Sequence, residues 1–341
     1  MKRVKAKYYL IPALICMAGL VAIGYFYFLT AFSAQEGKQY VLIDDDDTVD
    51  SVYAKLEPVA SHHALTGFRT LARHFSYSEK IRTGRYAIEP GMNTVNTFRI
   101  IKNGQQEPVM LTIPECRTIE QLAARLSAKL MIDSTTIAQT LTDEDYCKQL
   151  GYDTCTIVCV FVPNSYEVYW NTSIEKLMGR MVKEHDRFWT SERKQKAAAL
   201  GLSPTEVCTL ASIIDEETAN NAEKPMIAGM YLNRLKIGMP LQADPTVKFA
   251  LKDFALKRIY HGHLEINSPY NTYKNIGLPP GPIKVASVQG IDAVLNRVAH
   301  HYIYMCAKED FSGTHNFAAN YQEHLKNAAR YSKALNERGI K

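Results

Sequence analysis

The sequence predicts an α+β protein with a single N-terminal transmembrane helix, a small strand–helix module and a mixed α+β domain. Three observations support this prediction: a basic tail before a long uncharged run, short β-branched segments that lead into capped helices, and amphipathic helices in the second half. At 341 residues the chain is long enough for an anchor and two modest domains. We expect the parts to be 1–34, 35–108 and 109–341, with 109–150 as a connecting segment.

The N-terminal segment has the pattern of a membrane anchor. Lys2, Arg3, Lys5 and Lys7 precede an uncharged run from Tyr8 to Phe32, which is long enough to cross a bilayer. The positive charges predict a cytoplasmic N-terminus and an exported remainder. A cleaved signal peptide is the alternative, but the run exceeds the roughly 7–15 apolar residues of a signal sequence.

Charge and cysteine content limit the partners. Four of the 40 Lys and Arg residues precede the run, which leaves 36 against 35 Asp and Glu in the exported part. This near-neutral balance does not suggest nucleic acid, whose binding needs concentrated positive charge. Six of seven cysteines follow the anchor. Cys208 is expected to be a buried thiol, a disulfide among Cys147, Cys155 and Cys159 stays open, and no zinc pattern or cofactor motif is present.

A weak internal repeat occupies residues 40 to about 130. A strand, a polar turn and a helix capped by Thr48 recur about seventy residues later with Thr118 as the cap, and residues 84–92 hold a similar strand and turn. The run Asp44–Asp47 lacks the spaced ligands of an EF-hand calcium loop. A solvated helix N-terminus explains these aspartates better.

One helix, predicted from Leu202 to Thr218, carries the main candidate residue. The run Ser203 to Glu206 forms a capping box with proline in the first turn. An apolar stripe continues through Leu210 and Ile214 and meets Glu217, which lies within about 20° of Leu210. Asp215 falls at the edge of this stripe, and Glu216 points elsewhere.

A glutamate on a buried face needs an explanation, because burying its charge is costly. It could pair with an arginine such as Arg234 and be structural. Alternatively, desolvation raises its pKa, so that it stays protonated and donates a proton to a leaving oxygen.

Rigid turns rich in amides, hydroxyls and aromatic rings follow this helix, and such groups suit a sugar. In the run Leu241 to Thr246, the residue before Pro245 should be extended, so Gln242 and Asp244 should project to one side. The residues expected to orient a ligand are Gln242, Asp244, Tyr270, Asn271, Thr272, Tyr273 and His315.

At these residues the chain closely resembles the endolytic murein transglycosylases of the YceG-like (MltG) family. The motifs that carry the resemblance are Ala211–Thr218, Asn233–Thr246, Tyr270–Tyr273, Gly277–Ile283 and Gly313–Phe317, in the family's order. Residues 158–166 depart from the family pattern, Asp215 stands where glutamate is usual, and Ala243 replaces a common threonine.

The resemblance implies that Glu217 is the catalytic glutamate and that residues 35–108 form a LysM-like module beside the membrane. It implies a lytic transglycosylase that cuts nascent peptidoglycan strands, leaves 1,6-anhydro-muramoyl ends and limits glycan length, beside synthases such as penicillin-binding proteins. The enzyme would sit in the cytoplasmic (inner) membrane with its catalytic domain outside. Two rivals stay open: a hydrolytic muramidase that uses Glu217 with Asp244, and a non-catalytic wall-binding scaffold.

Overall fold

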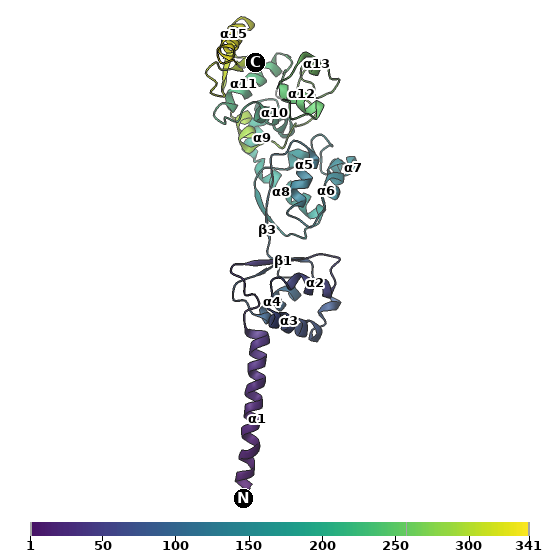
Figure 1. Ribbon diagram of the computed structural model, residues 1–341. Coiled ribbons are helices and arrows are strands. Elements are labelled where there is room, and N and C mark those ends of the chain that lie inside the picture. The colour runs from purple at the N-terminus through teal and green to yellow at the C-terminus, as the bar shows by residue number, and fades with distance from the viewer. Residues whose placement is uncertain (1, 257, 340–341) are drawn as a thin grey trace. The chain divides into compact units, whose positions relative to one another are not determined.

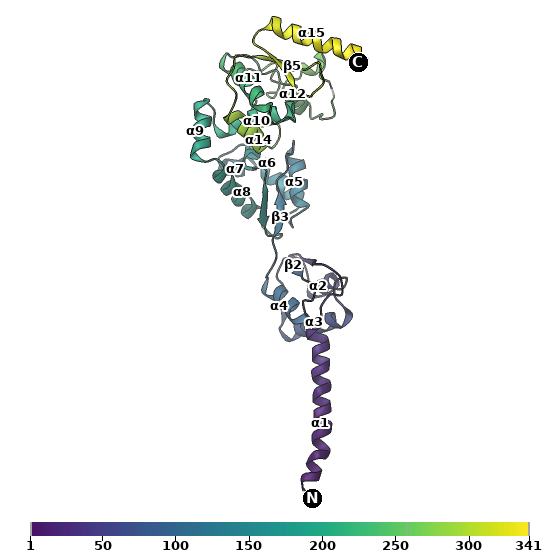
Figure 2. The ribbon, with the colours of Figure 1, turned by 90° about the vertical axis from the view of Figure 1, so that its left-hand side faces the viewer.

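The computed structural model describes residues 2–256 and 258–339, which form two compact units (Figures 1 and 2). Each unit is described by itself below. The first comprises the chain up to residue 110 with the short segments 129–131 and 167–172, and the second comprises 111–128, 132–166 and the chain from 173 onward.

The first unit begins with the apolar helix. Helix α1 (Lys2–Gly24) continues into a π-helical turn, η1 (Tyr25–Leu29), and Tyr9–Leu29 is long and apolar enough to cross a membrane. Large apolar side chains along it, such as Leu14 and Leu20, are exposed. The turn itself is packed on protein, because the ring of Phe26 stacks on that of His63 with 4.2 Å between centroids.

A two-stranded antiparallel sheet and three helices complete this unit. The order is β1 (Gln39–Ile43), α2 (Val49–Leu56), α3 (His62–His74), the short 3-10 turn η2 (Tyr77–Glu79), β2 (Gly84–Ile88) and α4 (Thr94–Asn103). Strands β1 and β2 pair with Val41 opposite Tyr86, and alternate residues of both strands face a core around Phe68.

The predicted helix starts in this region are confirmed. Thr48 caps α2 in a capping box with Ser51. Lys55 binds Asp44 at 2.9 Å and Asp47 at 2.6 Å, and Asp47 also accepts a hydrogen bond from the Ser51 hydroxyl. The aspartates therefore stabilise the start of a helix, as expected from the sequence.

The middle of the chain holds a second two-stranded sheet and a group of helices. Strand β3 (Val109–Thr112) pairs with β4 (Ser165–Val168). The helical elements are α5 (Ile119–Ser127), α6 (Ser134–Thr142), α7 (Glu144–Gln149), η3 (Ile157–Val160) and α8 (Ile174–Phe188). Thr118 caps α5 as predicted, by accepting a hydrogen bond from the Gln121 amide. The predicted apolar stripe of α8 is buried at Leu177, Met178 and Met181.

The remaining elements surround one helix. They are α9 (Ser191–Ala199), α10 (Pro204–Glu217), α11 (Lys224–Lys236), α12 (Asp244–Leu251), α13 (His261–Leu264), α14 (Val288–Leu295), β5 (Tyr304–Ala307), β6 (His315–Ala318) and α15 (Tyr321–Glu337). Strands β5 and β6 form an antiparallel pair, and the main core of the second unit is built around α10.

Helix α10 begins as predicted, with a capping box between Ser203 and Glu206. It differs from the expected single apolar stripe, because every residue from Val207 to Ile214 is buried. A helix that is covered on all sides is a core helix. The stripe therefore does not distinguish the carboxylates at its end; their partners do.

The α+β class with one N-terminal apolar helix is confirmed. None of the seven cysteines forms a disulfide, and Cys147, Cys159 and Cys208 are buried thiols. The expectation for Cys208 is thus confirmed.

Candidate active site

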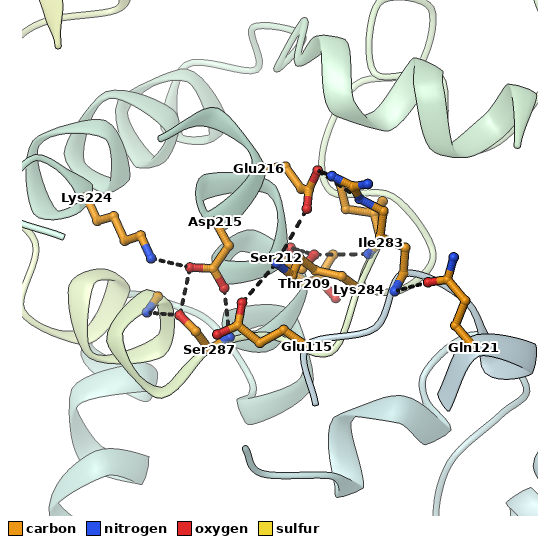
Figure 3. A network of polar contacts seen from close by, with 12 residues as sticks. Glu115, Gln121, Thr209, Ser212, Asp215, Glu216, Lys224, Ile283, Lys284 and Ser287 are labelled. Atoms are coloured by element: carbon orange, nitrogen blue, oxygen red, sulfur yellow. Dashed lines mark hydrogen bonds and ion pairs between the residues drawn. The ribbon is translucent and has the colours of Figure 1, made fainter. Parts of the chain in front are cut away.

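Three consecutive carboxylates end helix α10, and each has a different partner. Asp215 has only 1% of its side chain exposed. Its Oδ1 lies 2.7 Å from the Lys224 ammonium, and its carboxylate accepts hydrogen bonds from the Ser287 amide at 2.7 Å and the Ser287 hydroxyl at 2.8 Å (Figure 3). Asp215 therefore joins α10 to the starts of α11 and α14 and is structural. The stripe edge predicted for Asp215 is covered by the start of α14, so its side chain is buried there.

The packing at this junction is tight. A Cβ at Gly290, in the first turn of α14, would lie 2.5 Å from the Asp215 carboxylate. Only glycine fits there.

Glu216 points away from the core, as predicted. Its Oε2 accepts hydrogen bonds from Arg117 at 2.7 and 3.1 Å, and its Oε1 lies 3.4 Å from Lys284, which also binds Glu115 (Figure 3). This chain of charges ties α10 to the segment before α5. Arg117 and Lys284 are thus both neutralised by carboxylates.

Glu217 has a neutral partner. The hydroxyl of Tyr231, on α11, donates a 2.6 Å hydrogen bond to its Oε1, and no ion pair to Glu217 occurs among the described residues. The structural alternative named Arg234 as an example of a cationic partner. That side chain instead donates to two carbonyls, those of Leu241 at 2.5 Å and Ile303 at 2.6 Å.

The surroundings of Glu217 suit a proton donor. Burial raises the pKa of the Glu217 carboxyl above its usual value, and the hydrogen bond from Tyr231 opposes part of this shift. The charge of Asp244 raises this pKa further, while His315 and Arg234 lower it. Burial also holds the pKa of Tyr231 well above its ordinary value, so its hydroxyl stays protonated.

Asp244 and Tyr273 form the second part of the site. The hydroxyl of Tyr273 donates a 2.5 Å hydrogen bond to Asp244 Oδ1, and Asp244 is exposed to solvent. Burial is the largest cause that raises the pKa of Tyr273, and its hydrogen bond to Asp244 is the second. The charges of Asp244 and Glu217 raise this pKa further. Glu217, Asp244 and Tyr273 are therefore close enough to influence one another.

The segment before α12 alternates as expected. Leu241 and Ala243 are buried, whereas Gln242 and Asp244 are exposed. The extended residue is Ala243 rather than Asp244, because α12 already begins at Asp244. Gln242 has a left-handed φ of 49°, a conformation that costs a non-glycine residue roughly 1 kcal/mol and that often occurs at functional sites.

Asn271 and Thr272 have buried side chains that brace loops. The Asn271 amide donates to the carbonyls of Leu264 at 2.8 Å and Ile266 at 2.9 Å. The Thr272 hydroxyl accepts a 3.0 Å hydrogen bond from the Ala243 amide. Both residues therefore shape the backbone that presents Gln242 and Asp244, and neither side chain projects to the surface.

Tyr270 lines a cavity whose lining does not include Glu217. Its ring lies 4.7 Å from that of Phe249, and it lines a cavity of about 270 Å³ together with Cys155.

His315 starts strand β6 and is held by Glu223, the residue before α11. The Glu223 carboxylate accepts a 2.6 Å hydrogen bond from the backbone amide of His315, and its other oxygen lies 3.0 Å from the His315 ring nitrogen Nδ1. Sequence reasoning did not single out Glu223 or Tyr231. Tyr231 lies on α11 and Glu223 is the N-cap residue at its start; their burial in a polar helix was the available signal.

Comparisons with known proteins identify the family of this chain. The model of the YceG-like family matches residues 41–330. The chain belongs to the YceG-like family. Curated relatives are named endolytic murein transglycosylase: one from Bacillus subtilis is 31% identical over 75% of each chain, and one from Streptococcus pneumoniae is 26% identical over 95% of this chain. The chain spans 65% of the length of the pneumococcal relative.

A solved structure supports the same assignment. The crystal structure of a YceG-like protein from Listeria monocytogenes is 27% identical, with a TM-score of 0.57, and covers 86% of this chain and 99% of its own. The resemblance inferred from the sequence motifs is confirmed. The prediction of an enzyme of the lytic transglycosylase type agrees with the names of the relatives.

Proposed function

We propose that this protein is an endolytic peptidoglycan lytic transglycosylase with Glu217 as its single catalytic acid and base. The observation that carries the proposal is the environment of Glu217: a desolvated carboxyl whose partner is the neutral hydroxyl of Tyr231. A carboxyl paired with a cation would lose its proton and could not act as an acid. The names of the relatives supply the substrate, murein.

The reaction needs one carboxyl group for two proton transfers. Glu217 first donates its proton to the glycosidic oxygen, the muramoyl C1–O bond breaks, and the N-acetylglucosamine leaves with a free 4-hydroxyl. The Glu217 carboxylate then takes the proton of the muramoyl 6-hydroxyl as that oxygen bonds to C1. The products are a 1,6-anhydro-muramoyl end and a protonated Glu217, and no water is consumed.

The other residues of the site would orient the sugars. Asp244 and Gln242 offer neighbouring hydrogen-bonding groups, and Tyr273 holds Asp244 in place. His315 is held by Glu223 and lowers the pKa of Glu217. Tyr270 would contact substrate farther from the cut bond. Asn271 and Thr272 would contribute by bracing the loop.

The proposed location follows from the N-terminal segment. With Tyr9–Leu29 in the cytoplasmic membrane, the catalytic unit lies outside and meets nascent strands soon after synthesis, beside penicillin-binding proteins. Cutting there terminates strand elongation. The order β1, α2, α3, β2 within residues 35–108 supports the LysM-like interpretation of this module.

A hydrolytic muramidase is the second candidate, favoured by one observation. Asp244 lies near enough to raise the pKa of Glu217, so a second carboxylate is at hand. Hydrolytic glycosidases generally use two carboxylates.

Product analysis tests both candidates. Purified sacculi digested with wild-type protein should give muropeptides with anhydro ends by mass spectrometry. Glu217→Gln should fold normally and lose at least ~10²-fold in activity, the usual contribution of a general acid. Glu192→Gln is the matched control, because this glutamate of α9 is largely exposed and its ion pair with Lys196 lies on one helix. Reducing ends would favour the hydrolase, and an active Glu217→Gln would reject Glu217 as the acid.

A further inference from the structure

A groove runs along helix α12, away from Asp244. Two adjoining cavities form it, and Arg117, Phe249 and Phe254 line both. We define the α12 groove by these three residues together with Glu216, Lys248 and Lys252. The larger cavity has a volume of about 270 Å³, near the lower limit for pockets that hold drug-sized ligands. It has room for a short segment of substrate.

The groove and the proposed catalytic site share two elements. On α10, Glu216 lines the groove and the next residue is Glu217. On α12, Asp244 is the first residue, Pro245 lines the smaller cavity, and Lys248 and Lys252 follow at intervals of four. At a rise of about 1.5 Å per residue these lysines lie roughly 6 and 12 Å along the helix from Asp244.

The charge of the groove contrasts with the rest of the exported chain. Its two cavities are lined by four basic residues (Arg117, Lys248, Lys252, Lys284) and two acidic ones (Glu120, Glu216). Arg117 and Lys284 are neutralised by ion pairs, whereas Lys248 and Lys252 enter none within residues 2–256 and 258–339. The exported part as a whole is close to neutral.

Apolar and aromatic side chains form the rest of the wall. Phe249, Phe254 and Tyr270 line the groove, and the guanidinium of Arg117 lies 5.3 Å from the centre of the Phe254 ring. Side-chain amides, which bind sugar hydroxyls, are absent from the lining. A ligand with small apolar groups and carboxylates fits this surface better than a further length of sugar chain.

We propose that the α12 groove binds the acidic stem peptide carried by the muramic acid next to the cut bond. This inference rests on the proposed function and adds a specificity site to it. The stem begins at the lactyl group of that sugar and extends about 3.3–3.6 Å per residue. Its second and third residues therefore lie about 7 and 11 Å from the attachment point, close to the roughly 6 and 12 Å that separate Lys248 and Lys252 from Asp244 along α12.

The first test compares two substrates with the full-length protein in detergent. Glycan strands with intact stems should be cleaved with at least about tenfold higher kcat/KM than strands stripped by an amidase. Lys248→Gln and Lys252→Gln should each reduce this ratio by up to about fivefold, the upper range for a partly exposed charge pair. Lys194→Gln replaces an exposed lysine of α9 and should leave the ratio unchanged. Equal cleavage of both substrates by wild type would overturn the inference.

A binding measurement separates this inference from the proposed function. The inactive Glu217→Gln protein should bind a muramoyl dipeptide with a free glutamate carboxylate more tightly than its amidated form. Adding Lys248→Gln and Lys252→Gln should remove that difference. Binding with this pattern but no cleavage of either strand by wild type would reject the lyase and leave the groove assigned. Equal binding of both dipeptides would reject the groove.

Discussion

Asp215 has no direct role in the proposed chemistry, but replacing it by alanine should destabilise the second unit severely. The variant would leave the Lys224 ammonium, which is 8% exposed, without the carboxylate that binds it at 2.7 Å, and would remove two hydrogen bonds to Ser287. Removing one member of a buried ion pair costs about 3–5 kcal/mol. For a unit of this size each kcal/mol lowers Tm by about 2–4 °C, so the expected loss is about 6–20 °C.

Thermal unfolding followed by tryptophan fluorescence can measure this loss. The chain has two tryptophans, and Trp189 is buried in the core that contains α10. In a Trp170→Phe background the signal therefore reports that core. The full-length protein in detergent should be used. Glu144→Ala is the control, because its ion pair with Lys148 is exposed and should contribute no more than about 1 kcal/mol.

A double variant tests the reasoning further. Lys224→Met removes the unpaired charge, so Asp215→Ala combined with Lys224→Met should be more stable than Asp215→Ala alone. A Tm loss no larger than that of Glu144→Ala, or a double variant as unstable as the single one, would show that burial of this pair does not determine the stability of the junction.

Three further predictions concern the site and the anchor. Tyr231→Phe removes a hydrogen bond that lowers the pKa of Glu217; because the protonated acid is the active form, the alkaline limb of the kcat/KM profile should move to higher pH, and a shift to lower pH would contradict this. Asp244→Asn should reduce turnover but still yield anhydro ends, since an amide can hold a hydroxyl; complete loss in a folded protein, with reducing ends from wild type, would support two-carboxylate hydrolysis. The N-terminal segment should be retained, so N-terminal sequencing of the membrane fraction should not begin near Gln35.

Features that depend on near neighbours in the chain could be predicted from the sequence. The helix caps Thr48, Thr118 and Ser203 bind backbone amides three residues away, so their signals are local. The span Tyr9–Leu29 follows from composition alone. Helix α3 was not predicted, although Ala64, Leu65, Phe68 and Ala72 follow helical spacing. It begins with two histidines and has no side-chain cap, so the sequence carries no clear signal for its start.

The roles of individual polar residues depended on partners far away in the sequence. Asn271 and Thr272 occur in a motif rich in hydrogen-bonding groups, yet the fold buries both against backbone. Tyr270, their neighbour, faces another cavity. Composition suggests that such groups are available to a ligand, but only packing decides which of them already have partners.

The three carboxylates at the end of α10 show the same division. Their sequence places a buried carboxylate at this helix end, and the family motif selects Glu217. The difference between them comes from residues on other elements: Lys224 for Asp215, Arg117 for Glu216 and Tyr231 for Glu217. A carboxyl beside a cation is held ionised, whereas one that is desolvated beside a neutral hydroxyl can keep its proton. The sequence determined that an acid stands here, and the tertiary structure decided which carboxyl can act as one.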